Sequence, residues 1–149
     1  MPISIKTNKR KEKLAPFVAL IMKNLDTDSK KVAKIVLIND NQEVLMLKRA
    51  PKSKKHANEW DLPGGHIKNS ETPMQGLKRE VQEETNISVK HAKFYKKQKN
   101  KSFFYSKYKK TKIKLSDEHT EFAFFGADEL DPSKKFQKIA LEVLKRQQK

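Results

Sequence analysis

Residues 61–87 read DLPGGHIKNSETPMQGLKREVQEETNI, and the second half of this stretch carries strong signals of a helix. Thr72 is a candidate N-cap, Pro73 falls at the first helical position, and Gln75 can close a capping box onto Thr72. Asn86 follows the last turn, and asparagine is second only to glycine in tolerating the left-handed conformation that ends many helices. These signals predict a helix that begins at Pro73 and ends immediately before Asn86.

Three glutamates, Glu80, Glu83 and Glu84, fall within one sector of this helix, because successive residues are rotated by about 100°. Like charges one turn apart destabilise a helix by about 0.2–0.5 kcal/mol per pair. A bound divalent cation would explain the cluster, because Mg²⁺ prefers oxygen ligands. Arg79 can hold Glu83 one turn away, or reach back to Glu71 and tie the preceding loop to the helix. The alternative is a solvated helix face with ordinary glutamates.

The complete stretch resembles the Nudix box, in which a glycine and a glutamate precede an Arg-Glu pair, an aliphatic residue and a Glu-Glu pair. The positions that match are Gly65, Glu71, Arg79, Glu80, Val81, Glu83, Glu84 and Ile87. Asn86 stands where the pattern has glycine, a change that is compatible with the same backbone. The resemblance to the Nudix hydrolase family implies an α/β protein, with an α/β/α sandwich that places a mixed β-sheet between helices.

The resemblance also implies which residues carry the chemistry. The metal, Mg²⁺ or Mn²⁺, would be held by Glu80, Glu83, Glu84 and the carbonyl of Gly64. Gly65 and Glu71 would have structural roles in the box, and Arg79 would orient Glu71 and Glu83. The general base would be a helix glutamate, or Glu118 or Glu121 from a later loop. His119 is a candidate proton carrier, although a single loop histidine is more often inert.

Three further residues are candidates for substrate binding: Arg49, which opens a basic loop, Trp60, which leads into the glycines, and Tyr105. Residues 90–114 contain eleven lysines and no acidic residue, with aromatic residues between them. Such a segment can bind a nucleotide by stacking and charge. Alternatively, residues 103–108 form a strand whose aromatic side chains face the core.

Nudix enzymes hydrolyse a nucleoside diphosphate linked to another moiety, so the resemblance implies metal-dependent pyrophosphate hydrolysis. We expect an ADP-ribose-like or dinucleoside polyphosphate substrate, and Tyr105 falls where some members of the dinucleoside polyphosphate group have a tyrosine. Alternatives are a housecleaning nucleoside triphosphate pyrophosphohydrolase of the MutT type, an RNA 5′-pyrophosphohydrolase, and a nucleotide-binding module without activity. The helix glutamates are all present, which argues against the last alternative.

The chain has 149 residues and a net charge of +16, which attracts polyanions such as nucleotides or RNA, unless the lysines merely solvate the surface. It has no cysteine, which excludes disulfides and thiolate metal sites and fits a cytoplasmic protein. No apolar run approaches the roughly 20 residues that span a bilayer. We expect a monomer or a homodimer.

We expect a basic N-terminal arm over residues 1–13 and a single domain over residues 14–149. Apolar residues at helical spacing predict a first helix over 14–25, with a strand over 17–22 as the alternative. The other predicted elements are a hairpin of 32–38 with 43–48, strands over 87–95, 103–108 and 121–126, a turn or short helix over 127–131, and a helix over 134–147.

Overall fold

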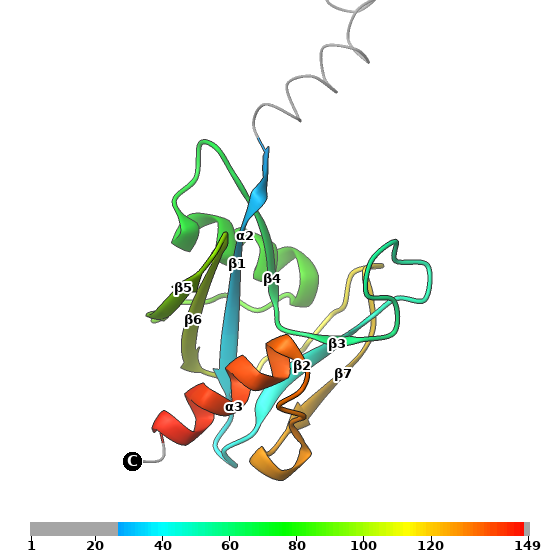
Figure 1. Cartoon of the computed structure of the whole chain (residues 1–149), viewed down its shortest axis with the longest axis vertical. Helices are drawn as coiled ribbons and strands as arrows, with labels where there is room; N and C mark the ends of the chain where they lie inside the picture. The colour runs from blue at the N-terminus through cyan, green and yellow to red at the C-terminus, as the bar shows by residue number, and fades with distance from the viewer. Residues whose placement is uncertain (1–26, 148–149) are drawn as a thin grey trace, which may run out of the picture.

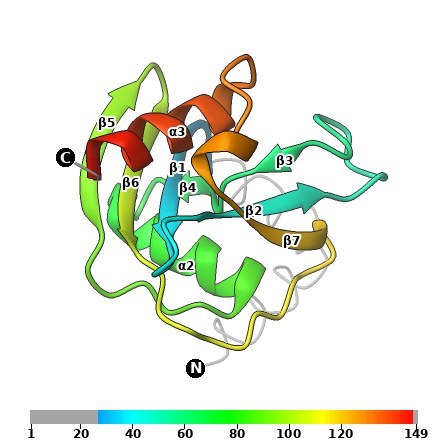
Figure 2. The same ribbon diagram turned by 90° about the horizontal axis from the view of Figure 1, so that it is seen from below.

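The computed structural model describes residues 27–147, in which seven strands form a single mixed sheet. Figures 1 and 2 show that one helix packs on each face of this sheet. The strands are β1 (Thr27–Ile38), β2 (Val44–Arg49), β3 (Trp60–Asp61), β4 (Gly64–Lys68), β5 (Lys93–Gln98), β6 (Lys101–Lys107) and β7 (His119–Phe125). The helices are α2 (Pro73–Thr85), the 3₁₀ turn η1 (Ala127–Glu129) and α3 (Lys135–Gln147). This is the α/β architecture with a mixed sheet between helices that was expected.

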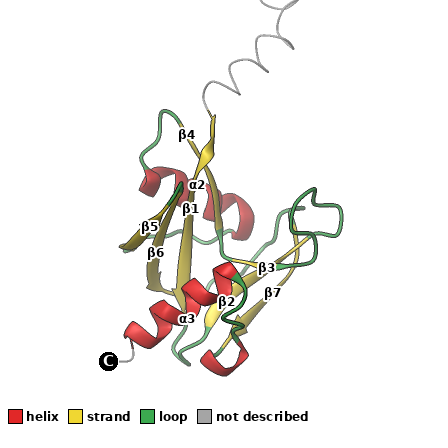
Figure 3. Ribbon diagram, viewed as in Figure 1, coloured by secondary structure: helices red, strands yellow, loops and turns green. Residues whose placement is uncertain are grey.

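Strand β1 is the centre of the sheet. It pairs in parallel with β6 and antiparallel with β4, and its last residue, Ile38, pairs with Val44 of β2. Strand β2 also carries β3 and β7, and β5 lies outside β6. The two arms of the sheet therefore diverge from β1, and Figure 3 shows β2, β3 and β7 splayed away from β5 and β6. The first two residues of β4, Gly64 and Gly65, are called the box glycines below. They pair with Lys34 and Ala33 of β1, where the two arms of the sheet separate.

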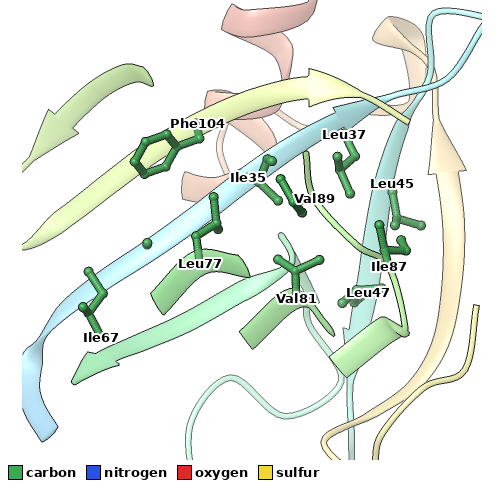
Figure 4. Close-up of a cluster of buried hydrophobic side chains, with 11 residues drawn as sticks. Ile35, Leu37, Leu45, Leu47, Ile67, Leu77, Val81, Ile87, Val89 and Phe104 are labelled. Carbon is green, nitrogen blue, oxygen red and sulfur yellow. The ribbon is translucent and has the colours of Figure 1, made fainter. Parts of the chain in front are cut away.

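Alternate residues of β1 face opposite helices, as the two-residue period of a strand requires. Ala33, Ile35 and Leu37 are buried in the cluster that also contains Leu77 and Val81 of α2. Figure 4 shows this cluster beneath the sheet. Val36 and Ile38 belong instead to the cluster on the α3 side, together with Ile139, Ala140, Val143 and Leu144. Burial on both faces explains why residues 32–38 are almost continuously apolar.

The predicted box helix is confirmed at both ends. The hydroxyl of Thr72 accepts a hydrogen bond from the backbone N–H of Gln75, and the side chain of Gln75 accepts one from the backbone N–H of Thr72. Asn86 ends the helix with φ 68° and ψ 14°, in the left-handed region. The local capping signals thus determine where α2 begins and ends.

The predicted hairpin is also confirmed, since β1 and β2 pair across the turn at Ile38 and Val44. The predicted strand over 87–95 is wrong in its first half, because β5 begins only at Lys93. Ile87 and Val89 are apolar because they are buried against α2, not because they belong to a sheet ladder. An apolar run of this length cannot distinguish the two situations.

The predicted arm over 1–13 and the predicted first helix over 14–25 lie outside the described residues. Within residues 27–147, no helix has both the length and the apolar character needed to cross a bilayer.

Candidate active site

Arg79 joins the box loop to the box helix. Its Nε and Nη2 donate to the two carboxylate oxygens of Glu71 at 2.7 and 3.0 Å, so the predicted bidentate contact is present. Nη1 donates to Glu80 at 2.9 Å and approaches Glu83 at 3.5 Å, and Nη2 also donates to the carbonyl of His66 at 3.0 Å. The hydrogen bonds that Arg79 donates to Glu71 raise the pKa of Arg79 and lower the pKa of Glu71. The guanidinium is therefore a fixed positive centre beside the helix carboxylates.

Glu84 lies beneath the box glycines and is almost fully buried. Its Oε1 accepts a 2.8 Å hydrogen bond from the backbone N–H of Gly64. Gly64 has φ 126°, and a Cβ at this position would lie 2.1 Å from the carbonyl oxygen of Ala33, so only glycine allows this approach. Burial raises the pKa of Glu84 to about 8, although the nearby Lys34 opposes the shift.

The other two helix glutamates differ in exposure. Glu80 is partly buried against Gly65, where an added Cβ would lie 2.7 Å from its Oε2. Burial raises the pKa of Glu80 above its ordinary value, and the charges of Glu83 and Glu118 add to this effect. The side chain of Glu83 is 60% exposed, and within residues 27–147 its only ion pair is the long one with Arg79, at 3.5 Å. The three carboxylates on one face thus form a gradient from buried to solvent-exposed.

A buried ion pair lies on the other side of the glycine turn. Nζ of Lys34 is 3.1 Å from Oδ2 of Asp61, and it also donates to the carbonyls of Leu62 and Gly64 at 3.2 and 3.0 Å. Arg49 approaches the same Oδ2 at 3.4 Å. Burial alone would raise the pKa of Asp61, but Lys34 and His119 outweigh it, and the pKa falls to about 2. Asp61 is therefore ionised.

The carbonyl of Gly64, a predicted metal ligand, is thus already an acceptor for Lys34. A carbonyl oxygen has a second lone pair, so this contact alone does not exclude coordination.

Sequence reasoning overlooked Lys34 and Asp61 as parts of the site. One signal was available, because Lys34 interrupts the apolar run of residues 32–38. A lysine within a strand that is buried on both faces requires a buried acceptor, and Asp61 supplies it.

His119, at the start of β7, completes the centre of the site. Its ring lies between two buried carboxylates, with Nδ1 4.0 Å from Oε2 of Glu84 and Nε2 3.9 Å from Oδ2 of Asp61. Glu118 brings a carboxylate from solvent to the same point. One ligand atom each from Glu84, Glu118 and His119 lies within 4.8 Å of the other two.

The two candidate loop bases are separated by the structure. Glu118 lies in the group with Glu84 and His119 and is exposed. Glu121 lies within β7, where it pairs with Lys48 at 3.3 Å and its side chain is 58% exposed. Glu118 is therefore the one that the fold places against the buried carboxylate of the box helix.

The predicted substrate-binding residues occupy different places. Arg49 lies beside Asp61, and its Nε donates to the carbonyl of Lys55 at 3.1 Å. Trp60 packs edge-on against Phe125, with ring centroids 4.9 Å apart, in the cluster on the α3 side. Tyr105 lines a cavity of about 650 Å³ that begins where α2 ends, and neither Arg49 nor Trp60 lines it.

The side chains around Glu84 fit a divalent cation. They offer carboxylate oxygens and an imidazole nitrogen, and both donor types bind such ions. Burial keeps Glu84 protonated near neutral pH, because desolvation disfavours its charged form. A bound cation would stabilise the charged carboxylate. Among the described residues, both ring nitrogens of His119 are buried side-chain atoms that have no hydrogen-bond partner. The ion would be held by Glu84 and Glu80, with Glu118 beside Glu84.

Comparison with known proteins shows the family and the fold of the chain. The sequence model of the NUDIX domain family matches residues 28–147, so the chain belongs to this family. Over 62 residues it is 37% identical to the 8-oxo-dGTP diphosphatase of Escherichia coli (strain K12), a match that covers 42% of this chain and 47% of that protein. The match thus spans about half the length of that curated relative.

Two solved structures share the fold. The MutT protein from Methanosarcina mazei Go1 superposes with a TM-score of 0.62 at 25% identity, covering 79% of this chain and 94% of that one. A C. elegans Ap4A hydrolase binary complex superposes with a TM-score of 0.59 at 22% identity, covering 79% and 96%. These similarities establish the mixed sheet and its helices as a Nudix fold.

Proposed function

We propose that the chain is a metal-dependent pyrophosphohydrolase that cleaves nucleoside triphosphates between the α- and β-phosphorus atoms. The observation that carries the proposal is the approach of Glu118 to the buried Glu84, in a site where Arg79 fixes the neighbouring glutamates. The diphosphatase relative supports a triphosphate substrate more directly than the ADP-ribose-like substrate that the sequence led us to expect.

In this proposal each residue has a defined task. When bound, a divalent cation neutralises charge on the substrate phosphates and lowers the pKa of the attacking water. Glu84 and Glu80 hold the ion, and the hydrogen bond from Gly64 fixes the orientation of Glu84. Glu118 accepts a proton from the attacking water, because it is exposed and lies beside Glu84.

Arg79 and Arg49 are the two arginines of the proposed site. Arg79 holds Glu71 and Glu80 and thus keeps the helix carboxylates in place. Arg49, whose side chain is 29% exposed, is placed to bind a substrate phosphate while Asp61 anchors it from behind. Charge neutralisation and positioning account for most of the catalysis of phosphoryl transfer.

A panel of nucleotides tests the function. Nucleoside triphosphates, oxidised triphosphates, dinucleoside tetraphosphates, ADP-ribose and 5′-triphosphorylated RNA are incubated with Mg²⁺, Mn²⁺ or EDTA, and the products are identified by mass. We expect a triphosphate to give a monophosphate and pyrophosphate with metal and nothing with EDTA. Binding of a nucleotide without turnover under any condition would show a non-catalytic module.

The general base is tested by a matched pair of substitutions. Glu118→Gln should lower kcat by about 10²–10⁴-fold. Glu121→Gln, which alters only a surface pair with Lys48, should lower it less than about threefold. A larger loss of kcat in Glu121→Gln than in Glu118→Gln would assign the general base to Glu121.

A second candidate substrate class is supported by the cavity at the end of α2. Tyr105 and Tyr108 line it together with Lys107 and Lys109. Aromatic rings and ammonium groups suit a second nucleoside and its phosphates. If dinucleoside polyphosphates are substrates, Tyr105→Ala should raise their KM and leave the KM of a triphosphate unchanged. An equal effect on both substrates would exclude a second nucleoside in this cavity.

A further inference from the structure

His119 occupies a position that requires a partner. Its side chain is fully buried. Within the described part of the chain, neither ring nitrogen has a hydrogen-bond partner. A buried polar group left without a hydrogen bond destabilises the folded state. The fold therefore holds the imidazole at a cost that a ligand would relieve.

The surroundings of the ring indicate what that ligand is. The distances from Nδ1 to Glu84 and from Nε2 to Asp61, 4.0 and 3.9 Å, are too long for hydrogen bonds. A first-row divalent ion has its nitrogen and oxygen ligands at about 2.0–2.2 Å, so two ligands of one ion can lie roughly 4 Å apart. The separation between Nδ1 and Glu84 is thus compatible with an ion between them, and a carboxylate oxygen of Glu118 lies within 4.8 Å of a ligand atom of each of these two residues.

We propose that Nδ1 of His119 is a direct ligand of the divalent cation held by Glu84, and that Asp61 orients the imidazole from the opposite side. The inference rests on the proposed metal-dependent function and adds a nitrogen donor to it. Imidazole is a good ligand for first-row transition-metal ions such as Fe²⁺ and Zn²⁺, whereas Mg²⁺ prefers oxygen. The site therefore selects a transition-metal ion over Mg²⁺.

Asp61 is built for the orienting role. A metal-binding histidine almost always donates its other ring N–H to a carboxylate, a backbone carbonyl or water. Asp61 faces Nε2 and cannot turn away, because Lys34 holds its Oδ2 at 3.1 Å and the N–H of Leu62 donates to its Oδ1 at 2.7 Å. A hydrogen bond from Nε2–H to Asp61 would select the Nε2–H tautomer and leave the lone pair of Nδ1 directed at Glu84.

Pulsed electron paramagnetic resonance of the full chain loaded with Mn²⁺ tests the proposal, because ¹⁴N bound to Mn²⁺ modulates the spin echo. We expect this modulation in the wild type and in His91→Gln, a control at an exposed histidine, and its loss in His119→Gln. Titration calorimetry should show the Kd of Mn²⁺ rising about 10–100-fold in His119→Gln, with less than about a threefold change for Mg²⁺.

Labelling the wild type with ¹⁵N-histidine tests histidine coordination without a substitution. If an imidazole is bound to Mn²⁺, the ¹⁴N modulation must be replaced by ¹⁵N modulation. Bound Mn²⁺ without a nitrogen signal would overturn the histidine assignment. Turnover of nucleotides by that same sample would leave the proposed function standing. Absence of both Mn²⁺ binding and turnover would overturn both proposals.

Discussion

The ammonium of Lys34 lies 3.1 Å from Oδ2 of Asp61, and both side chains are buried in the middle of the protein. The same nitrogen donates to the carbonyls of Leu62 and Gly64. An ammonium has three N–H donors, so all three are used. Lys34, on the central strand β1, thereby holds the turn that contains Gly64 against this strand.

Removing this ammonium should be strongly destabilising. Lys34→Met removes the 3.1 Å ion pair from the buried charge of Asp61 and leaves the longer, 3.4 Å pair with Arg49, so we expect the free energy of unfolding to fall by about 3–5 kcal/mol in urea denaturation. Adding Asp61→Asn should restore part of the loss. Lys48→Met, which removes the half-buried partner of the exposed Glu121, is the control and should change stability by less than about 1 kcal/mol. Equal effects of Lys34→Met and Lys48→Met would refute the structural role of Lys34.

Replacing Arg79 with lysine should lower turnover more than stability. A lysine is a single point charge and cannot hold both oxygens of Glu71 together with Glu80. Misplaced carboxylates should lower kcat/KM by about 10²-fold, while the free energy of unfolding falls by about 1–2 kcal/mol. Arg146→Lys, at the end of α3, serves as the control. If Arg79→Lys turns over substrate at the wild-type rate, the bidentate contact of the guanidinium with Glu71 is not required for activity.

The glycine at position 65 should be required for metal-dependent activity. In Gly65→Ala the new Cβ would lie 2.7 Å from Oε2 of Glu80, so this carboxylate must turn away. We expect at least about a tenfold loss of kcat/KM and, because the end of a glutamate is flexible, a stability change below about 1 kcal/mol. Gly126→Ala is the matched control, because its nearest neighbour lies 3.6 Å away. Unchanged kinetics in Gly65→Ala would contradict the packing of Glu80 on this glycine.

The metal-free protein should lose stability as the pH rises from about 4.5 to about 8. Burial raises the pKa of Glu84 from 4.5 to about 8, so in this window the folded state keeps a proton that the unfolded state has released. The free energy of unfolding should fall by up to about 1.4 kcal/mol per pH unit from this group. Glu84→Gln, which cannot titrate, should remove that slope, as measured by urea denaturation in EDTA. An identical slope in the two proteins would show that Glu84 is ionised without metal.

Much of the box was predictable because its determinants are local. The capping pair Thr72 and Gln75 and the left-handed Asn86 set the limits of α2 without help from the rest of the chain. The contact of Arg79 with Glu71 also follows from a short loop that leads directly into the helix. By contrast, Ile87 and Val89 resemble a strand in sequence, yet they pack on α2 without a ladder, because burial and strand formation favour the same residues.

The sequence by itself determined the box helix, its row of glutamates, and the hairpin before it, because hydrogen bonds and side-chain periodicity within a few residues specify them. Only the tertiary structure decided which charged groups meet at the site. Lys34, Asp61 and His119 come from three strands, and the pairing of β1, β3 and β7 around β2 brings them together. Their burial sets the protonation of Glu84 and Asp61, because desolvation and charge pairing depend on neighbours that are distant along the chain.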